Sequence, residues 1–210
     1  MPTRDTYAGK RREEVLSLVE EIYKKDRFAQ FGQDWQGIKL SEKCVLMGHS
    51  HGGTTMLDAA ADCPRAAAII SFDPWFMPMN DKRDWKVRDE QKVLVTHTEH
   101  FKDTLFQEHE GVSSKGIFQK LADNCKIRPS LYYLKEHWHQ QCTDFMFLMP
   151  LAICLPTQKS LPEADYKERC LMHAWMAIEF MEKEKIVKDR AQGVLEKMNR
   201  VRKYISPEWL

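Results

Sequence analysis

Short, uninterrupted apolar runs alternate along this chain with segments whose apolar residues fall at helical spacing. Apolar runs of this kind, bounded by polar residues, predict strands that are buried on both faces of a sheet. They occupy residues 43–47, 66–71, 92–96 and 130–134. Helical spacing or helix-compatible composition predicts helices over residues 10–25, 52–61, 114–124, 163–184 and 187–204. This alternation predicts an α/β protein with a mostly parallel sheet.

The composition is that of an ordinary globular protein. The 210 residues fit one domain, which we assign to residues 1–210. Lys and Arg number 32 against 31 Asp and Glu, and this balance argues against a nucleic-acid-binding protein, which usually carries a basic excess. The six cysteines form no C-x-x-C pair, so the sequence signals neither a zinc knuckle nor a thioredoxin-type site.

The chain shows no targeting segment. Residues 1–6 lack the apolar core of a secretory signal. No apolar run reaches the length of a membrane span. We therefore expect a cytoplasmic protein.

One motif carries chemistry. Residues 48–52, Gly-His-Ser-His-Gly, match G-x-S-x-G and lie between a predicted strand and a predicted helix. In a nucleophile elbow the serine sits on a strained turn, so side chains two positions before and two after it must be absent. The N–H of His51 would then face the oxyanion that develops when Ser50 attacks a carbonyl group. The alternative is a glycine-rich turn of a non-catalytic or nucleotide-binding fold, but the G-x-G-x-x-G spacing of a Rossmann turn is missing.

Partners for Ser50 follow it in the order acid, then histidine, that such folds use. Asp73 stands at the end of a predicted strand, where a parallel sheet presents catalytic groups, although an Asp before Pro74 could also simply begin a turn. Asp81 and Asp84 lie in a charged loop and are expected to be solvated. The base is His137 or His139, since both follow the last predicted strand, and the residues themselves leave this choice open.

The other histidines have no motif around them. His97, His100, His109 and His173 are expected to be surface or satisfied interior residues. The pairs His137-x-His139 and His49-x-His51 could bind zinc, but they lack a third ligand at convincing spacing. We predict no metal and no cofactor.

Three segments resemble the platelet-activating factor acetylhydrolases, the group VII phospholipases A2. Residues 48–55, Gly-His-Ser-His-Gly-Gly-Thr-Thr, are similar to that family's elbow. Residues 70–78, Ile-Ser-Phe-Asp-Pro-Trp-Phe-Met-Pro, resemble its acid segment, and the interval from Ser50 to Asp73 also matches. Residues 139–145 resemble its His-Gln-x-x-x-Asp-Phe signature, in which the histidine is the base. The resemblance therefore selects His139 over His137.

The resemblance, which covers residues 43–148, implies an α/β-hydrolase fold and a Ser50, Asp73, His139 triad. It implies calcium-independent hydrolysis of a short acyl ester at the second position of a phospholipid substrate. Trp75 and Phe76, with the methionines that follow, would wall the substrate pocket, or they would pack in the core beside it. The apolar run at 147–155 would touch a membrane surface transiently, or it would form a buried helix.

Two departures from the family matter. His51 stands where the animal enzymes usually carry Phe, which leaves the backbone N–H unchanged but alters the pocket. The family's enzymes are about twice as long, and their N-terminal half supplies the first strands and a second oxyanion donor. We therefore expect this chain to be the C-terminal portion of the fold. The alternatives are a general carboxylesterase or lipase of the same fold, and a catalytically inactive fragment.

Overall fold

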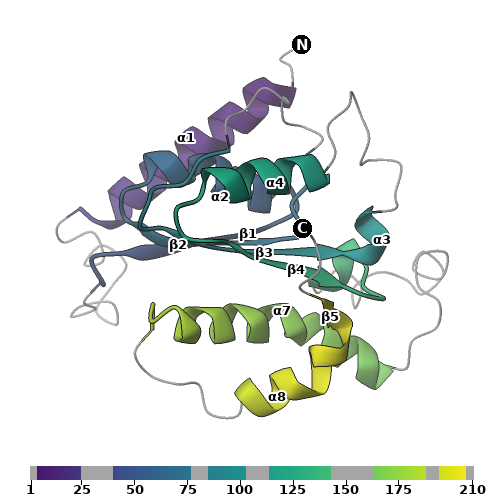
Figure 1. The fold of residues 1–210 in the computed structure, drawn as a ribbon. Coiled ribbons are helices and arrows are strands. Elements are labelled where there is room, and N and C mark those ends of the chain that lie inside the picture. Colours follow the sequence, from purple (N-terminus) through teal and green to yellow (C-terminus); the bar gives the residue numbers. More distant parts are fainter. Residues whose placement is uncertain are drawn as a thin grey trace.

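A computed structural model describes residues 4–24, 40–76, 85–102, 114–142, 163–187 and 194–206. Within these ranges a five-stranded sheet has the order β1-β2-β3-β4-β5 (Figure 1). The strands are β1 (Cys44–His49), β2 (Ala66–Phe72), β3 (Lys92–Thr98), β4 (Ser130–Leu134) and β5 (Ile205–Ser206). Strands β1 to β4 run parallel, whereas β5 pairs antiparallel with β4. The predicted α/β class with a mostly parallel sheet is confirmed.

Helices cover both faces of the sheet (Figure 1). On one face lie α1 (Arg4–Ile22), α2 (His51–Ala59) and α4 (Ser114–Asn124); on the other lie α7 (Glu163–Lys183) and α8 (Val194–Val201). Shorter turns complete the described chain: α3 (Glu99–Lys102), η3 (Ala60–Asp62), η4 (His139–Cys142) and η5 (Arg202–Tyr204). In the described part of the chain, no helix combines the length and apolar character that crossing a membrane requires.

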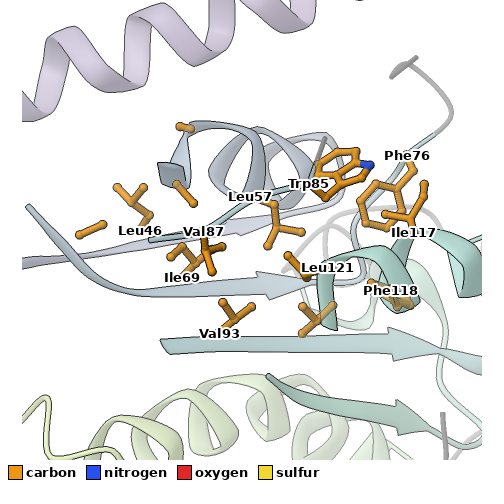
Figure 2. Close-up of a cluster of buried hydrophobic side chains, with 14 of the residues drawn as sticks. Leu46, Leu57, Ile69, Phe76, Trp85, Val87, Val93, Ile117, Phe118 and Leu121 are labelled. Atoms are coloured by element: carbon orange, nitrogen blue, oxygen red, sulfur yellow. The ribbon is translucent and has the colours of Figure 1, made fainter. Parts of the chain in front are cut away.

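Strand residues alternate between two apolar layers because successive side chains point to opposite faces of a sheet. Ile69 and Val93 pack in the cluster between the sheet and the α2 and α4 side, which Figure 2 shows. Ile70 and Leu94 pack in the opposite cluster, against Ala177 and Phe180 of α7. Full burial of each such aliphatic side chain contributes about 1.5–3 kcal/mol. Burial on both faces is what the uninterrupted apolar runs predicted.

The strand register brings the functional positions to one edge of the sheet. His49, the last residue of β1, pairs with Phe72 at the end of β2, and Phe72 pairs with Thr96 in β3. Thr98 in turn pairs with Leu134 at the end of β4. Because the strands are parallel, the residues that follow them all emerge at their carboxyl ends.

The predicted elements match closely except at the C-terminal end. The strand at 130–134 and the helix at 114–124 have the expected bounds, and the first helix begins earlier, at Arg4. The predicted helix over 187–204 is wrong at its C-terminal end, where α8 (Val194–Val201) gives way to η5 and β5, and at Val187, which lies in a bend; residues 188–193 lie outside the described residues. A two-residue strand has too little pattern to be recognised in a sequence, and β5 depends on pairing with β4.

Candidate active site

Ser50 occupies a strained turn between β1 and α2, with φ 57° and ψ −126°. A Cβ at Gly48 would lie 2.5 Å from the backbone of Gly52 and 2.8 Å from the nitrogen of Gly53, so this position must be glycine. A Cβ at Gly53 would lie 2.6 Å from Oγ of Ser71. A Cβ at Gly52 would meet nothing within 4 Å. The expected steric need for glycine is therefore confirmed at Gly48 and wrong at Gly52, and Gly53 has the close contact instead.

The turn is tied to the segment that follows β2. The N–H of Ser50 donates to the carbonyl oxygen of Phe72 at 3.0 Å, and the N–H of Trp75 donates to the carbonyl oxygen of Ser50 at 3.1 Å. The hydroxyl of Thr54 donates to the carbonyl oxygen of Trp75 at 2.9 Å. These bonds hold an unfavourable backbone conformation that would otherwise cost about 1–3 kcal/mol. They also fix the nucleophile position relative to the chain around Asp73.

The three residues that the sequence singled out lie in one hydrogen-bonded chain. Oγ of Ser50 is 2.8 Å from Nε2 of His139, and Nδ1 of His139 is 2.7 Å from Oδ2 of Asp73. With Nδ1–H donated to the carboxylate, Nε2 is left to accept the serine proton. The side chain of His139 is 16% exposed, so the base reaches the surface while the carboxylate behind it is fully buried.

The Asp73 carboxylate is held by several donors. Thr98 donates its N–H to Oδ1 at 2.9 Å and its hydroxyl to Oδ2 at 2.6 Å. Nδ1 of His97 lies 2.6 Å from Oδ1. Burial by itself would raise the pKa of Asp73, but His97 and the hydrogen bond from His139 outweigh burial and hold that pKa well below its usual range. An ionised carboxylate here can orient the imidazole and stabilise its charged form.

Two aromatic rings pack against the ring of His139. Phe101 of α3 stacks on it with centroids 3.7 Å apart and an interplanar angle of 17°. His49 lies on it with centroids 4.5 Å apart, and Nε2 of His49 is 2.9 Å from the carbonyl oxygen of His139. Burial, with the nearby His139, lowers the pKa of His49 to about 4. His49 is therefore neutral near pH 7 and can donate its Nε2–H to that carbonyl group.

The loop that carries the base, residues 135–140, is held mostly by side chains from distant elements and by one main-chain bond. We call it the base loop. Glu136 has φ 57°, and its N–H donates to a carboxylate oxygen of Glu99 at 2.7 Å. Arg169 of α7 donates to the carbonyl oxygen of Glu136 and pairs with the side chain of Glu136 at 3.1 Å. The N–H of Lys135 donates to the carbonyl oxygen of Tyr204 at 2.8 Å.

His137 turns away from the nucleophile. Its side chain is fully buried, and its Nδ1–H donates to the carbonyl oxygen of Lys135 at 2.8 Å. Its ring lies 6.3 Å from that of His173 and 5.7 Å from that of Tyr204. Burial lowers the pKa of His137 to about 4. The sequence itself left the choice between His137 and His139 open. Their environments differ, and only His139 lies within hydrogen-bonding distance of Ser50.

The backbone also supplies a candidate oxyanion donor. Helix α2 begins at His51, so the N–H of His51 is among the first-turn donors that have no intrahelical acceptor. The helix N-terminus adds a partial positive charge at the same place. This is the arrangement expected for an oxyanion hole, and the role of His51 stays a prediction.

The candidate pocket residues differ in their surroundings. Phe76 is 4% exposed and packs edge to face against Trp85 and Phe118, as Figure 2 shows. These contacts favour core packing for Phe76, whereas Trp75 is half-buried beside the elbow. Several further predictions lie outside the described residues: Met77, Met79, Asp81, Asp84, the Asp144-Phe145 end of the signature and the apolar run at 147–155.

Sequence reasoning missed residues that support the site. His97 and Thr98 reach Asp73, and Glu99 and Phe101 reach the base loop and the base. All four follow or end β3, so the strand-end argument that selected Asp73 would have pointed to them. No group of three or more His, Cys, Asp or Glu residues is arranged to hold a metal ion in the ranges that the structure describes.

Comparisons with known proteins agree with the geometry. A family model described as platelet-activating factor acetylhydrolase, isoform II, matches residues 6–199. A curated protein from Gallus gallus, named platelet-activating factor acetylhydrolase, is 24% identical over 139 residues. The aligned segment covers 65% of this chain and 28% of the Gallus gallus protein, so the chain spans well under two thirds of that relative.

Proposed function

This chain belongs to the platelet-activating factor acetylhydrolase family, a family of α/β-hydrolases, and from that premise we propose that it is a serine esterase. The proposed reaction is hydrolysis of the acetyl ester at the second position of platelet-activating factor and of similar short-chain phospholipids, in lipid degradation. The enzyme would thus be a 1-alkyl-2-acetylglycerophosphocholine esterase. The observation that carries the proposal is the hydrogen-bonded chain from Ser50 through His139 to Asp73.

In the proposed mechanism, Nε2 of His139 takes the proton of Ser50 while Oγ attacks the acetyl carbonyl carbon. The carbonyl oxygen becomes an oxyanion, which accepts a hydrogen bond from the N–H of His51. The tetrahedral intermediate collapses, His139 gives its proton to the departing glycerol oxygen, and an acetyl-serine remains. Water, deprotonated by His139, then attacks this ester, and acetate leaves as Ser50 regains its proton. Asp73 stays ionised throughout and stabilises the imidazolium.

The proposal includes no calcium ion, because the three side chains supply the nucleophile, the proton transfers and the charge stabilisation. It includes a phospholipid substrate and transient contact with a membrane surface. Trp75 would contact the substrate from its position beside the elbow, where its N–H is bonded to Ser50.

The alternative is a fragment that carries the triad without turning over. The observation that favours it is coverage, since the aligned segment corresponds to only 28% of the Gallus gallus protein. The missing portion in such a fragment would include the second oxyanion donor that the family resemblance implies. A single donor is worth roughly a hundred- to thousandfold in kcat, so its absence would be measurable.

The test combines fluorophosphonate labelling with a panel of esters. We expect Ser50 to label and short-chain phospholipids to be cleaved with or without a calcium chelator. Ser50→Ala should abolish labelling and reduce hydrolysis roughly ten-thousandfold while the circular dichroism spectrum is unchanged. Cleavage of long-chain esters alone would favour a general carboxylesterase or lipase. A folded chain whose Ser50 does not label would support the inactive fragment.

A further inference from the structure

The buried carboxylate of Asp73 faces two imidazoles, one at each oxygen. His139 reaches Oδ2 from the base loop at 2.7 Å, and His97 reaches Oδ1 from β3 at 2.6 Å. The triad described above uses only the first of these contacts. The second belongs to a histidine that no motif marked and that has no part in the proton transfers.

His97 is held firmly in this position. Its side chain is 1% exposed, and its ring packs 5.7 Å from Phe118 and 5.8 Å from Phe101. Phe101 also stacks on His139, so the two imidazoles share both a carboxylate and an aromatic neighbour. A buried ring with packing on this scale has little freedom to leave Oδ1.

The contact constrains the rotation of the carboxylate. The terminal torsion of Asp is broad, so a carboxylate needs partners on both oxygens to keep one orientation. At Asp73, Oδ1 faces His97 and the N–H of Thr98, and Oδ2 faces His139 and the hydroxyl of Thr98. The positive end of the His97 N–H also interacts with the carboxylate charge. It thereby weakens the interaction of that charge with the imidazolium of His139.

We propose that His97 is a positioning residue of this site, which fixes the Asp73 carboxylate and moderates its pull on His139. The inference rests on the proposed function, because it assigns His97 a role through the proposed base. His97 itself does not touch the reacting atoms in this account. It acts through one nitrogen, Nδ1, which lies 2.6 Å from Oδ1 of Asp73.

Two variants of similar shape distinguish the effect of losing this nitrogen from the effect of losing the ring. Asn and Leu branch at the same carbon, and both remove the ring that packs against Phe101 and Phe118. His97→Asn keeps a donor where Nδ1 stands, whereas His97→Leu has none. The other titratable side chains of the site, Asp73, His139, Glu99, His49, His137 and His173, are unchanged in both variants.

We expect His97→Leu to lower kcat about tenfold with little change in KM, since the close contact of a polar nitrogen with the charged carboxylate is lost. The acid limb of its kcat/KM profile should move to higher pH by ~0.5 unit, because the carboxylate then holds the protonated base more strongly. His97→Asn should stay within about threefold of the parent and keep the parent's acid limb. Equal losses in both variants, or an acid limb that moves in neither, would overturn the proposal.

A spectroscopic measurement separates this proposal from the proposed function. With ¹⁵N-labelled histidine, the parent chain should give two downfield Nδ1–H proton signals, one from His139 and one from His97. His97→Leu should remove one signal and shift the other, and His97→Asn should leave the second in place. This result does not depend on turnover, so a chain that fails to hydrolyse esters but shows the pattern refutes only the proposed function. A His139 signal that is the same in all three proteins refutes only the positioning role.

Discussion

The nucleophile elbow and the base loop lie at the same edge of the sheet but are held in place by different means. The elbow is fixed by backbone: Ser50 bonds to Phe72 and Trp75 through main-chain groups, and Gly48 lets strand and helix approach. The base loop is fixed by side chains from α3, α7 and β1, with Arg169 and His49 among them. The comparison teaches that main-chain bonds and small residues can hold the nucleophile, whereas the base depends mostly on side chains from other elements.

The consequence is a difference in tolerance to substitution. In the elbow, a single added methyl group at Gly48 would collide with three backbone atoms of Gly52 and Gly53, so failure there should be abrupt. In the base loop the anchoring contacts are spread over several elements, so losing one should weaken the loop gradually. The exception in the loop is the catalytic imidazole itself.

The largest expected effect therefore comes from His139, with His137 as its matched control. His139→Ala should lower kcat/KM roughly a thousand- to ten-thousandfold, because neither serine deprotonation nor leaving-group protonation has a catalyst. His137→Ala should keep activity within about tenfold while lowering the free energy of unfolding by about 1–3 kcal/mol, since a buried, hydrogen-bonded side chain is removed. Initial rates and urea unfolding separate the two effects.

Equal activity losses in the two variants at unchanged stability would contradict this assignment of the base. Such a result would mean that His137 also takes part in the reaction, although its side chain is buried away from Ser50.

Two glycines test the elbow. Gly48→Ala should reduce fluorophosphonate labelling about a hundredfold or more, because its Cβ would lie 2.5 Å from the backbone of Gly52 and the serine would be displaced. Gly52→Ala has open space and should label within about threefold of the parent, with a small gain in helix propensity. The two variants are compared by their labelling rates at equal concentrations of folded protein. If Gly52→Ala labels as slowly as Gly48→Ala, steric contact is not the reason that the motif requires glycine.

The same contrast explains what the sequence could predict. The strands, the elbow and the place of Asp73 followed from apolar runs and strand ends, which are local features. The choice between His137 and His139 did not, because both stand within a turn of β4. His137 packs against His173 of α7 and Tyr204 of η5, whereas His139 packs against Phe101 of α3. It took family resemblance to select His139.

Other omissions have the same cause. His97 carries no motif, and its contact with Asp73 arises from the pairing of β2 with β3. The strand β5 exists only through its partner β4, and the α8 region was extended too far because the composition there remains compatible with a helix. Each of these features depends on residues far away along the chain, which periodicity within one segment does not encode.

The smallest expected effect concerns acid stability, and it should appear at the base loop first. Burial lowers the pKa of His137 to about 4 and that of His173 to about 3, from an ordinary value of 6.5. The unfolded chain therefore binds protons at these sites as the pH falls below 6.5, while the folded chain resists them down to about 4 and 3. The contribution of these two neutral histidines to the free energy of unfolding is fully present above pH 6.5. It decreases as the pH falls below 6.5, by up to about 1.4 kcal/mol per pH unit for each histidine.

His137 belongs to the base loop and His173 packs against it, and neither ring nitrogen of His173 has a hydrogen-bond partner among the described residues. Between pH 6.5 and 5 the amide protection factors, each taken relative to the intrinsic exchange rate at that pH, should accordingly fall at residues 135–140 while those of β2 stay high. His173→Phe should flatten the dependence of the unfolding free energy on pH. Two results together would contradict this prediction: equal loss of protection in both regions, and no effect of His173→Phe. The base loop would then be as stable to acid as the sheet, and the two regions would differ only in their tolerance to substitution.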